Sequence, residues 1–139
     1  MASLKNANIK NGFTLTTIIP AKPSKIYKAW SSAKGHTAMT GSAAKVNGKV
    51  GGKFSAWDGY IFGTTLELTP NERILQSWRT TEFPEGALDS RLEIIFEEVK
   101  GGTKITLAHS KMPEDQVDDY KQGWKDFYFK PMREYFEKR

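Results

Sequence analysis

The chain has 139 residues, with 21 Lys and Arg, 16 Asp and Glu, and no cysteine. This length favours one domain rather than two, and 38% hydrophobic residues are too many for a disordered chain. No apolar run approaches the roughly 20 residues that cross a bilayer, and the first residues, MASLKNANIKNG, lack the apolar stretch of a secretory signal. Without cysteine there is no disulfide, thiolate nucleophile or zinc–thiolate site. We therefore expect a cytoplasmic protein.

Charge is divided unevenly along the chain. Residues 1–57 hold nine lysines and no acidic residue, whereas residues 58–139 hold 12 basic and 16 acidic residues. A basic surface attracts an acidic protein, a membrane surface or a nucleic acid, but it can equally be plain solvated surface. Single lysines without arginine argue against nucleic acid. The candidate patch for an acidic partner consists of four lysines near two short helices: Lys22, Lys25, Lys28 and Lys34.

The N-terminal part predicts one strand and two short helices. The β-branched run Phe13–Ile19 alternates as a strand does. Ser24 is expected to cap a helix over residues 25–31. Gly35 is expected to break that helix, and a second one to cover residues 36–39.

Residues 46–110 predict antiparallel strands separated by Gly- and Pro-containing turns. The strongest local signal is Asp58-Gly59, which predicts a two-residue hairpin turn with positive φ at both positions. The flanking Trp57 and Tyr60 would then face each other as a cross-strand aromatic pair.

Alternation along these strands predicts which side chains point inward. On the strand after the hairpin the inward residues would be Tyr60, Phe62, Thr64, Leu66 and Leu68. That register leaves both Ile61 and Phe54 on the outer face, which the sequence does not explain. On the later strands the predicted inward residues are Ile74, Gln76, Trp78, Thr80, Leu92, Ile94, Phe96, Ile105 and Leu107.

A long helix is expected after Met112, with Pro113 in its first turn. Its apolar stripe is aromatic, and Pro131 within it should bend the helix. The predicted stripe is Val117, Tyr120, Trp124, Phe127, Tyr128, Pro131 and Tyr135. The order of elements predicts an α+β fold, a curved antiparallel sheet of about six to seven strands wrapped around this helix.

Eight short motifs, in this order and spacing, carry a specific resemblance. They are HTAMTG at 36–41, VGGKF at 50–54, WDGYIFG at 57–63, LELTP at 66–70, RILQSWR at 73–79, PEG at 84–86, GGT at 101–103 and QGWKDFY at 122–128. The chain resembles the helix-grip fold of the START-like, birch-pollen-allergen-like (SRPBCC) superfamily. More narrowly, it resembles the family named for the activator of the 90-kDa heat-shock protein ATPase. The resemblance implies a flexible segment over residues 1–11 and one START-like domain over residues 12–139.

The resemblance implies three functions, in order of preference. Across the superfamily the cavity between helix and sheet holds apolar ligands, so the first is non-catalytic binding of an apolar or amphipathic small molecule. The second is a chaperone-associated interaction module, linked to the stress response, that uses the lysine-rich half. The co-chaperone that names the family also has a separate N-terminal domain that binds the chaperone, so the resemblance does not by itself imply activation of the ATPase. A hydrolase or cyclase comes third, on analogy alone.

The inventory of reactive groups is small. His36 and His109 are the two histidines, and neither lies in a spacing typical of metal ligands. We expect no catalytic residue, metal or cofactor, no nucleic acid partner and no membrane span. Gln76, placed inward, needs a partner that is a backbone carbonyl, a water or a ligand. The residues expected to line a ligand cavity are Trp30, Trp57, Tyr60, Phe62, Gln76, Trp78, Trp124 and Tyr128.

Overall fold

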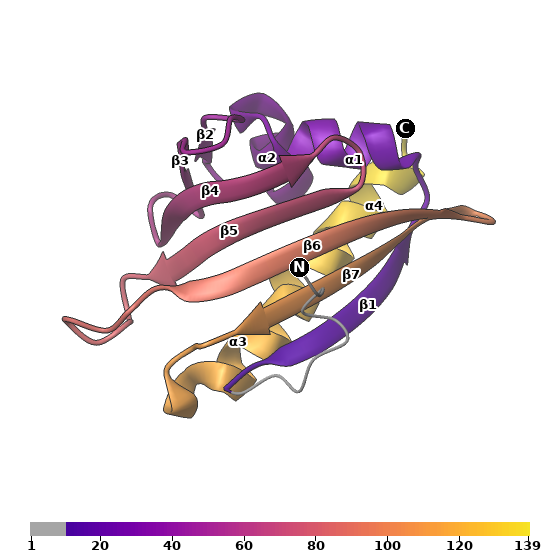
Figure 1. The fold of residues 1–139 in the computed structure, drawn as a ribbon. Helices are drawn as coiled ribbons and strands as arrows, with labels where there is room; N and C mark the ends of the chain where they lie inside the picture. The colour runs from indigo at the N-terminus through magenta and orange to yellow at the C-terminus, as the bar shows by residue number, and fades with distance from the viewer. Residues whose placement is uncertain (1–10) are drawn as a thin grey trace.

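The computed structural model describes residues 11–139 as a curved sheet that wraps around a C-terminal helix (Figure 1). The flexible segment expected at residues 1–11 lies outside the described residues, apart from Asn11. The predicted α+β fold is confirmed. The strands are β1 (Phe13–Ile19), β2 (Lys45–Val46), β3 (Lys53–Ala56), β4 (Ile61–Thr69), β5 (Arg73–Thr80), β6 (Ser90–Val99) and β7 (Gly102–Ser110). The helices are α1 (Pro23–Trp30), α2 (Ala33–Thr40), the 3-10 turn η2 (Glu114–Gln116), α3 (Val117–Trp124), the π-helical η3 (Lys125–Phe129) and α4 (Lys130–Glu137).

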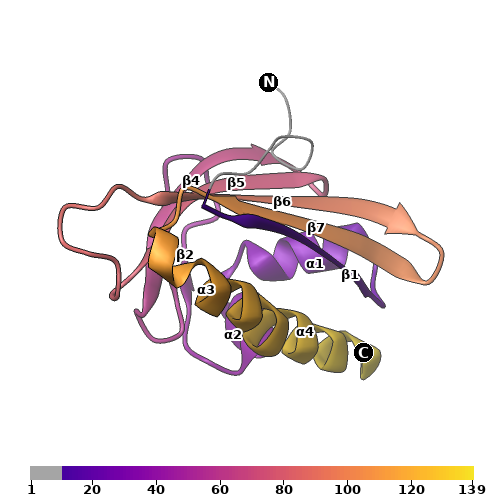
Figure 2. The ribbon, with the colours of Figure 1, turned by 90° about the horizontal axis from the view of Figure 1, so that it is seen from below.

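All seven strands belong to one antiparallel sheet in the order β1-β7-β6-β5-β4-β3-β2. The first strand thus pairs with the last one along the chain, and β1 and β2 form the two edges of the sheet. Figure 2 shows that the helices all lie against the same, concave face of the sheet. The hydrophobic core fills the space between that face and the helices.

The predicted inner faces of β5, β6 and β7 are confirmed, because the apolar residues predicted to point inward on them all belong to the hydrophobic core, whereas Leu75 and Ala108 on the alternate face do not. The register of β4 was predicted wrongly. Ile61 is buried and lies beside Phe54 on the inner face, whereas Phe62 is 36% exposed on the outer face. The inward Phe54 is therefore explained by the register in which it lies opposite Gly63.

A bulge then reverses the faces of β4. The pairing with β5 skips Leu66, and beyond it Leu68 lies opposite the buried Ile74. The extra residue turns the rest of the strand over. The sequence therefore predicted the side of Leu68 correctly and the side of Phe62 wrongly, since a single alternation cannot describe a bulged strand.

Two details of the short helices differ from expectation. Ser24 does not cap α1, which begins at Pro23 with Lys22 at its N-cap position. Gly35 does not end a helix but lies inside α2, where its amide donates to Ser32 Oγ at 3.1 Å. A Cβ at Gly35 would lie 2.5 Å from Cα of Ala29. Glycine is therefore needed there for the close packing of α1 on α2.

The turn around Asp58 is longer than a two-residue hairpin. The last paired residues are Ala56 and Ile61, so four residues make the turn. Asp58 and Gly59 have positive φ as predicted, but Trp57 also does, with φ of 53°. Trp57 and Tyr60 are consequently not a cross-strand pair, and both are only half-buried.

The long helix keeps its buried side chains on one line by means of a π-helical segment. Residues at intervals of four are buried along it: Tyr120, Trp124, Tyr128, Met132 and Phe136. In a regular α-helix each such step would drift by about 40°. The wider η3 segment, in which the Lys130 amide bonds to the Lys125 carbonyl, offsets this drift. The predicted stripe was wrong at Phe127, which is 56% exposed, and it omitted Met132 and Phe136.

Candidate functional site

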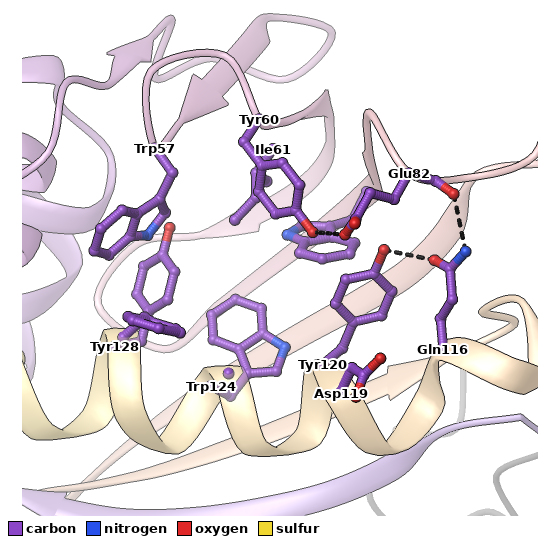
Figure 3. A pocket seen from close by; sticks show the side chains of 12 residues that line it. Trp57, Tyr60, Ile61, Glu82, Gln116, Asp119, Tyr120, Trp124 and Tyr128 are labelled. Carbon is purple, nitrogen blue, oxygen red and sulfur yellow. Dashed lines mark hydrogen bonds between the residues drawn. The ribbon is translucent and has the colours of Figure 1, made fainter.

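A cavity of about 570 Å³ lies between the long helix, the Trp57–Tyr60 turn and the loop after β5 (Figure 3). Its size is within the range of about 300–1,000 Å³ that is usual for small-molecule sites. It reaches the surface at the exposed Glu82 and Asp119. The lining residues are Trp57, Tyr60, Ile61, Trp78, Glu82, Gln116, Asp119, Tyr120, Gly123, Trp124, Phe127 and Tyr128.

Aromatic rings form most of the cavity wall. Trp124 packs against Tyr128, with ring centroids 4.6 Å apart, and against Trp78 at 6.0 Å. Trp57 lies edge-on to Phe127 at 5.5 Å. Such tilted and edge-to-face contacts are the favoured geometries of aromatic pairs. The wall is therefore fixed by ring-to-ring contacts and offers a large, preformed apolar surface.

Polar groups gather at one end of the cavity, as Figure 3 shows. Tyr60 Oη donates to the Glu82 carboxylate, and Tyr120 Oη donates to Gln116 Oε1 at 2.6 Å. Gln116 Nε2 donates to the backbone carbonyl of Glu82 at 2.9 Å. Thr80 Oγ1 lies 2.6 Å from Tyr120 Oη. This network joins the turn, the loop after β5 and the start of the helix into one polar edge.

The two tyrosines of the polar edge have pKa values above the ordinary one. Burial, and then the hydrogen bond to Glu82, raise the pKa of Tyr60. Burial also raises the pKa of Tyr120. Both hydroxyls therefore stay protonated at neutral pH and act as hydrogen-bond donors to the network.

His109 lies behind the cavity wall and is completely buried. The indole N–H of Trp124 donates to its Nδ1 at 3.0 Å, so the ring carries its proton on Nε2. Nε2 then donates to Ser90 Oγ at 2.8 Å, which donates in turn to the carbonyl of Trp78 at 2.6 Å. Burial lowers the pKa of His109 to about 3. The imidazole is thus neutral, engaged on both nitrogens and enclosed by the core.

His36 has a corresponding place at the other end of the wall. Its Nδ1 donates to the carbonyl of Trp30 at 3.1 Å, and its Nε2 accepts from Tyr128 Oη at 2.9 Å. Burial lowers the pKa of His36 and raises that of Tyr128. Both histidines therefore serve to position aromatic side chains of the cavity.

The cavity includes five of the eight side chains expected to line it: Trp57, Tyr60, Trp78, Trp124 and Tyr128. Three others lie elsewhere. Trp30 is buried behind Trp124, with ring centroids 6.1 Å apart, and Phe62 lies on the outer face of the sheet. Gln76 is buried within the sheet, where its Nε2 donates to Thr65 Oγ1 at 3.5 Å. This partner is a side-chain hydroxyl, and not the backbone carbonyl, water or ligand expected from the sequence.

Sequence reasoning missed the polar edge and much of the helix face. Glu82, Gln116 and Asp119 are exposed or half-buried, so no hydrophobic periodicity marks them. Tyr120 and Phe127 were placed in the helix stripe without a role in a cavity. A signal was nevertheless available, because positions 116, 119, 120, 123, 124 and 127 follow the three- and four-residue spacing of one helix face.

The lysines proposed as a patch are all exposed: Lys22, Lys25, Lys28 and Lys34. Across residues 11–139 no group of His, Asp and Glu is arranged to hold a metal ion. In the same part of the chain, no helix is both long and apolar enough to cross a membrane.

Residues 20–137 match the family described as Activator of Hsp90 ATPase homolog 1-like protein. The chain belongs to this family. The resemblance seen in the sequence motifs is thereby confirmed, and so is the helix-grip architecture that it implied.

Individual relatives support the same assignment. The chain is 26% identical over 123 residues to Activator of 90 kDa heat shock protein ATPase homolog 1 of Homo sapiens, covering 88% of this chain and 36% of that protein. It therefore spans about a third of the length of this curated relative. The crystal structure of PFC0360w, an HSP90 activator from Plasmodium falciparum, is 29% identical with a TM-score of 0.75, covering 85% of this chain and 90% of that one. Protein MLL2253 from Mesorhizobium loti, 20% identical with a TM-score of 0.76 and coverages of 91% and 96%, shows the shared fold.

Proposed function

We propose that this domain is non-catalytic and binds an apolar or amphipathic small molecule in the cavity beside the long helix. The observation that carries the proposal is the preformed space of about 570 Å³, lined mainly by aromatic rings. Burying apolar ligand surface there contributes roughly 25 cal/mol per Å². Because the wall is held by the contacts of Trp124 with Trp78 and Tyr128, little ordering cost opposes binding.

The state of the two histidines supports a non-catalytic role. A general base needs a free nitrogen within reach of a substrate proton. His36 and His109 are buried, and each uses both ring nitrogens in hydrogen bonds within the protein. They stabilise the wall instead of facing the cavity.

The test is titration with the neutral fluorophore N-phenyl-1-naphthylamine. We expect saturable one-to-one binding and a melting temperature that rises with probe concentration. The variant Gly123→Leu fills the cavity, since a Cβ at Gly123 would meet only the Phe127 ring at 3.9 Å. It should abolish binding, whereas the matched control Phe62→Ala on the outer face should retain it. Non-saturable binding, or equal binding by Gly123→Leu, would contradict the proposal.

A second function, association with a 90-kDa heat-shock chaperone, is favoured by the names of the human and Plasmodium relatives. The exposed lysines of α1 and α2 offer this domain a surface for an acidic partner. With purified chaperone, binding should weaken with salt and fall in the variant Lys25→Glu/Lys28→Glu. The control Lys121→Glu/Lys125→Glu changes the net charge equally on the long helix. Equal loss in both variants, or no binding at all, would contradict this surface.

A further inference from the structure

We propose that the cavity selects an organic cation, an ammonium or similar positive group carried on an apolar body. This proposal rests on the proposed small-molecule function and assigns the chemical class of the ligand. The cavity has two ends, an aromatic end at Trp57 and Tyr128 and a polar end at Glu82 and Asp119 (Figure 3).

The charged residues that line the cavity favour a cation. Glu82 and Asp119 are both acidic, and within residues 11–139 no Lys, Arg or His lines the cavity. This contrasts with a chain that has 21 Lys and Arg and a net charge of +5. The helix explains the segregation, because Lys121 and Lys125 fall between the helix positions that face the cavity. Two carboxylates at the rim would repel an anionic head group and could offer a neutral one only a hydrogen bond, whereas a cation would also gain charge attraction.

The start of the helix exerts an opposing effect that is too small to reverse this preference. The N-terminus of a helix behaves as roughly half a positive charge. Glu82 and Asp119 supply two full negative charges beside it, and Asp118 in the same first turn adds a third nearby. The charged groups that line the polar end therefore remain net negative beside the start of the helix.

The hydrogen bonds of the polar edge also favour a cationic ligand. The hydroxyl hydrogens of Tyr60 and Tyr120 are used within the protein, on the Glu82 carboxylate and on Gln116 Oε1. The oxygens of Glu82, Tyr60 and Tyr120 therefore still offer lone pairs to a ligand, and Gln116 adds one amide hydrogen beyond the bond to Glu82. Such oxygens accept hydrogen bonds from an ammonium group or surround a quaternary one.

The aromatic wall favours a cation as well. The faces of Trp and Tyr rings attract positive charge, by about 0.5–1 kcal/mol at exposed sites. Tyr120 and Trp78 lie 5.2 Å apart by ring centroids and adjoin the polar end, so a cation near Glu82 meets both carboxylate and rings. Carboxylates beside aromatic faces thus act together on one charge.

The experiment compares three probes with one aromatic body, by calorimetric titration at low and high salt. They are (1-naphthylmethyl)trimethylammonium, the neutral 2-(1-naphthyl)ethanol and the anionic 1-naphthylacetate. We expect the cation to bind about tenfold more tightly than the neutral probe, and the anion most weakly. Added salt should reduce both the advantage of the cation and the disadvantage of the anion, and should leave the affinity of the neutral probe unchanged.

A variant pair assigns this preference to specific side chains. Glu82→Gln/Asp119→Asn should bring the affinity of the cation close to that of the neutral probe and leave the neutral probe unchanged. The control Glu85→Gln/Asp118→Asn removes the same charge from the same loop and the same helix, at exposed positions that do not line the cavity. It should retain most of the preference. Melting temperatures of both variants check that each remains folded.

The outcomes separate the two proposals. Equal affinity for all three probes, or tighter binding of the anion, overturns the cation proposal and leaves small-molecule binding in place. A cation preference that survives Glu82→Gln/Asp119→Asn overturns the role of these carboxylates. If none of the probes binds, including N-phenyl-1-naphthylamine, the small-molecule function fails and the cation proposal fails with it.

Discussion

The indole N–H of Trp124 donates to Nδ1 of His109 at 3.0 Å, and both side chains are buried. This single contact ties the long helix to strand β7 behind the cavity. It also fixes the tautomer of His109 and the orientation of the Trp124 ring, which lines the cavity. The site therefore depends on a hydrogen bond that is buried behind the cavity wall.

The first prediction concerns Trp124 itself. Trp124→Ala should destabilise the domain by roughly 3–5 kcal/mol, because it empties a buried site and leaves His109 Nδ1 without its donor. Urea denaturation measures the free energy of unfolding. The control Phe127→Ala removes an aromatic ring that is 56% exposed on the same helix, and should cost about 1 kcal/mol or less. Similar costs for both variants would mean that burial of Trp124 does not dominate stability.

The second prediction is a loss of stability in mild acid. The pKa of His109 is about 3 in the folded protein and 6.5 ordinarily, so between these values the unfolded chain binds a proton that the folded chain excludes. The contribution of neutral His109 to the free energy of unfolding is complete above pH 6.5. It falls as the pH drops towards 3, by at most about 1.4 kcal/mol per pH unit. His36, whose pKa is also lowered, acts in the same direction.

Guanidinium denaturation between pH 8 and pH 5 measures this effect before most carboxylates become protonated. In parallel, the ring proton signals of His109 in NMR spectra should not titrate between pH 8 and pH 5. A His109 signal that titrates near pH 6.5 would show that the ring is not buried as described.

The third prediction compares the same substitution in two helices. Gly35→Ala should destabilise the domain by roughly 1–3 kcal/mol, because its Cβ would lie 2.5 Å from Cα of Ala29. Gly123→Ala should stabilise it by about 0.5–1 kcal/mol, since alanine favours the helix and the added Cβ has room. Thermal and urea unfolding measure both signs. Stabilisation by Gly35→Ala would disprove the close approach of α1 and α2.

The fourth prediction concerns the hydroxyl of Tyr128. Tyr128→Phe removes the donor to Nε2 of buried His36 and should cost about 1–3 kcal/mol, while the ring packing remains. The control Tyr135→Phe, on the half-buried Tyr135 of α4, should change stability by less than about 0.5 kcal/mol. Chemical denaturation of both variants is the measurement. An equal and small effect would mean that His36 finds another partner, such as water.

The alternation of apolar and polar residues predicted the inward side chains correctly on regular strands that pair with a neighbouring strand on both sides. The inner faces of β5, β6 and β7 followed from it, because each buries a continuous apolar row against the helix. It failed on β4, where Ile61 and Phe62 are both large and apolar. There the bulge at Leu66 and the pairing of Phe54 with Gly63 decided the register. Neither is encoded in the local pattern of one strand.

The sequence by itself determined the elements, the α+β fold and the aromatic character of the core, because periodicity and turn chemistry are local properties of the chain. Only the tertiary structure decided where the cavity lies and which groups edge it. Glu82, Gln116 and Tyr60 come from three separate segments and meet through hydrogen bonds. The π-helical segment, likewise, arises because the long helix must keep one line of side chains against a curved sheet. Such contacts depend on how segments distant in the sequence pack together, so the local pattern of residues does not predict them.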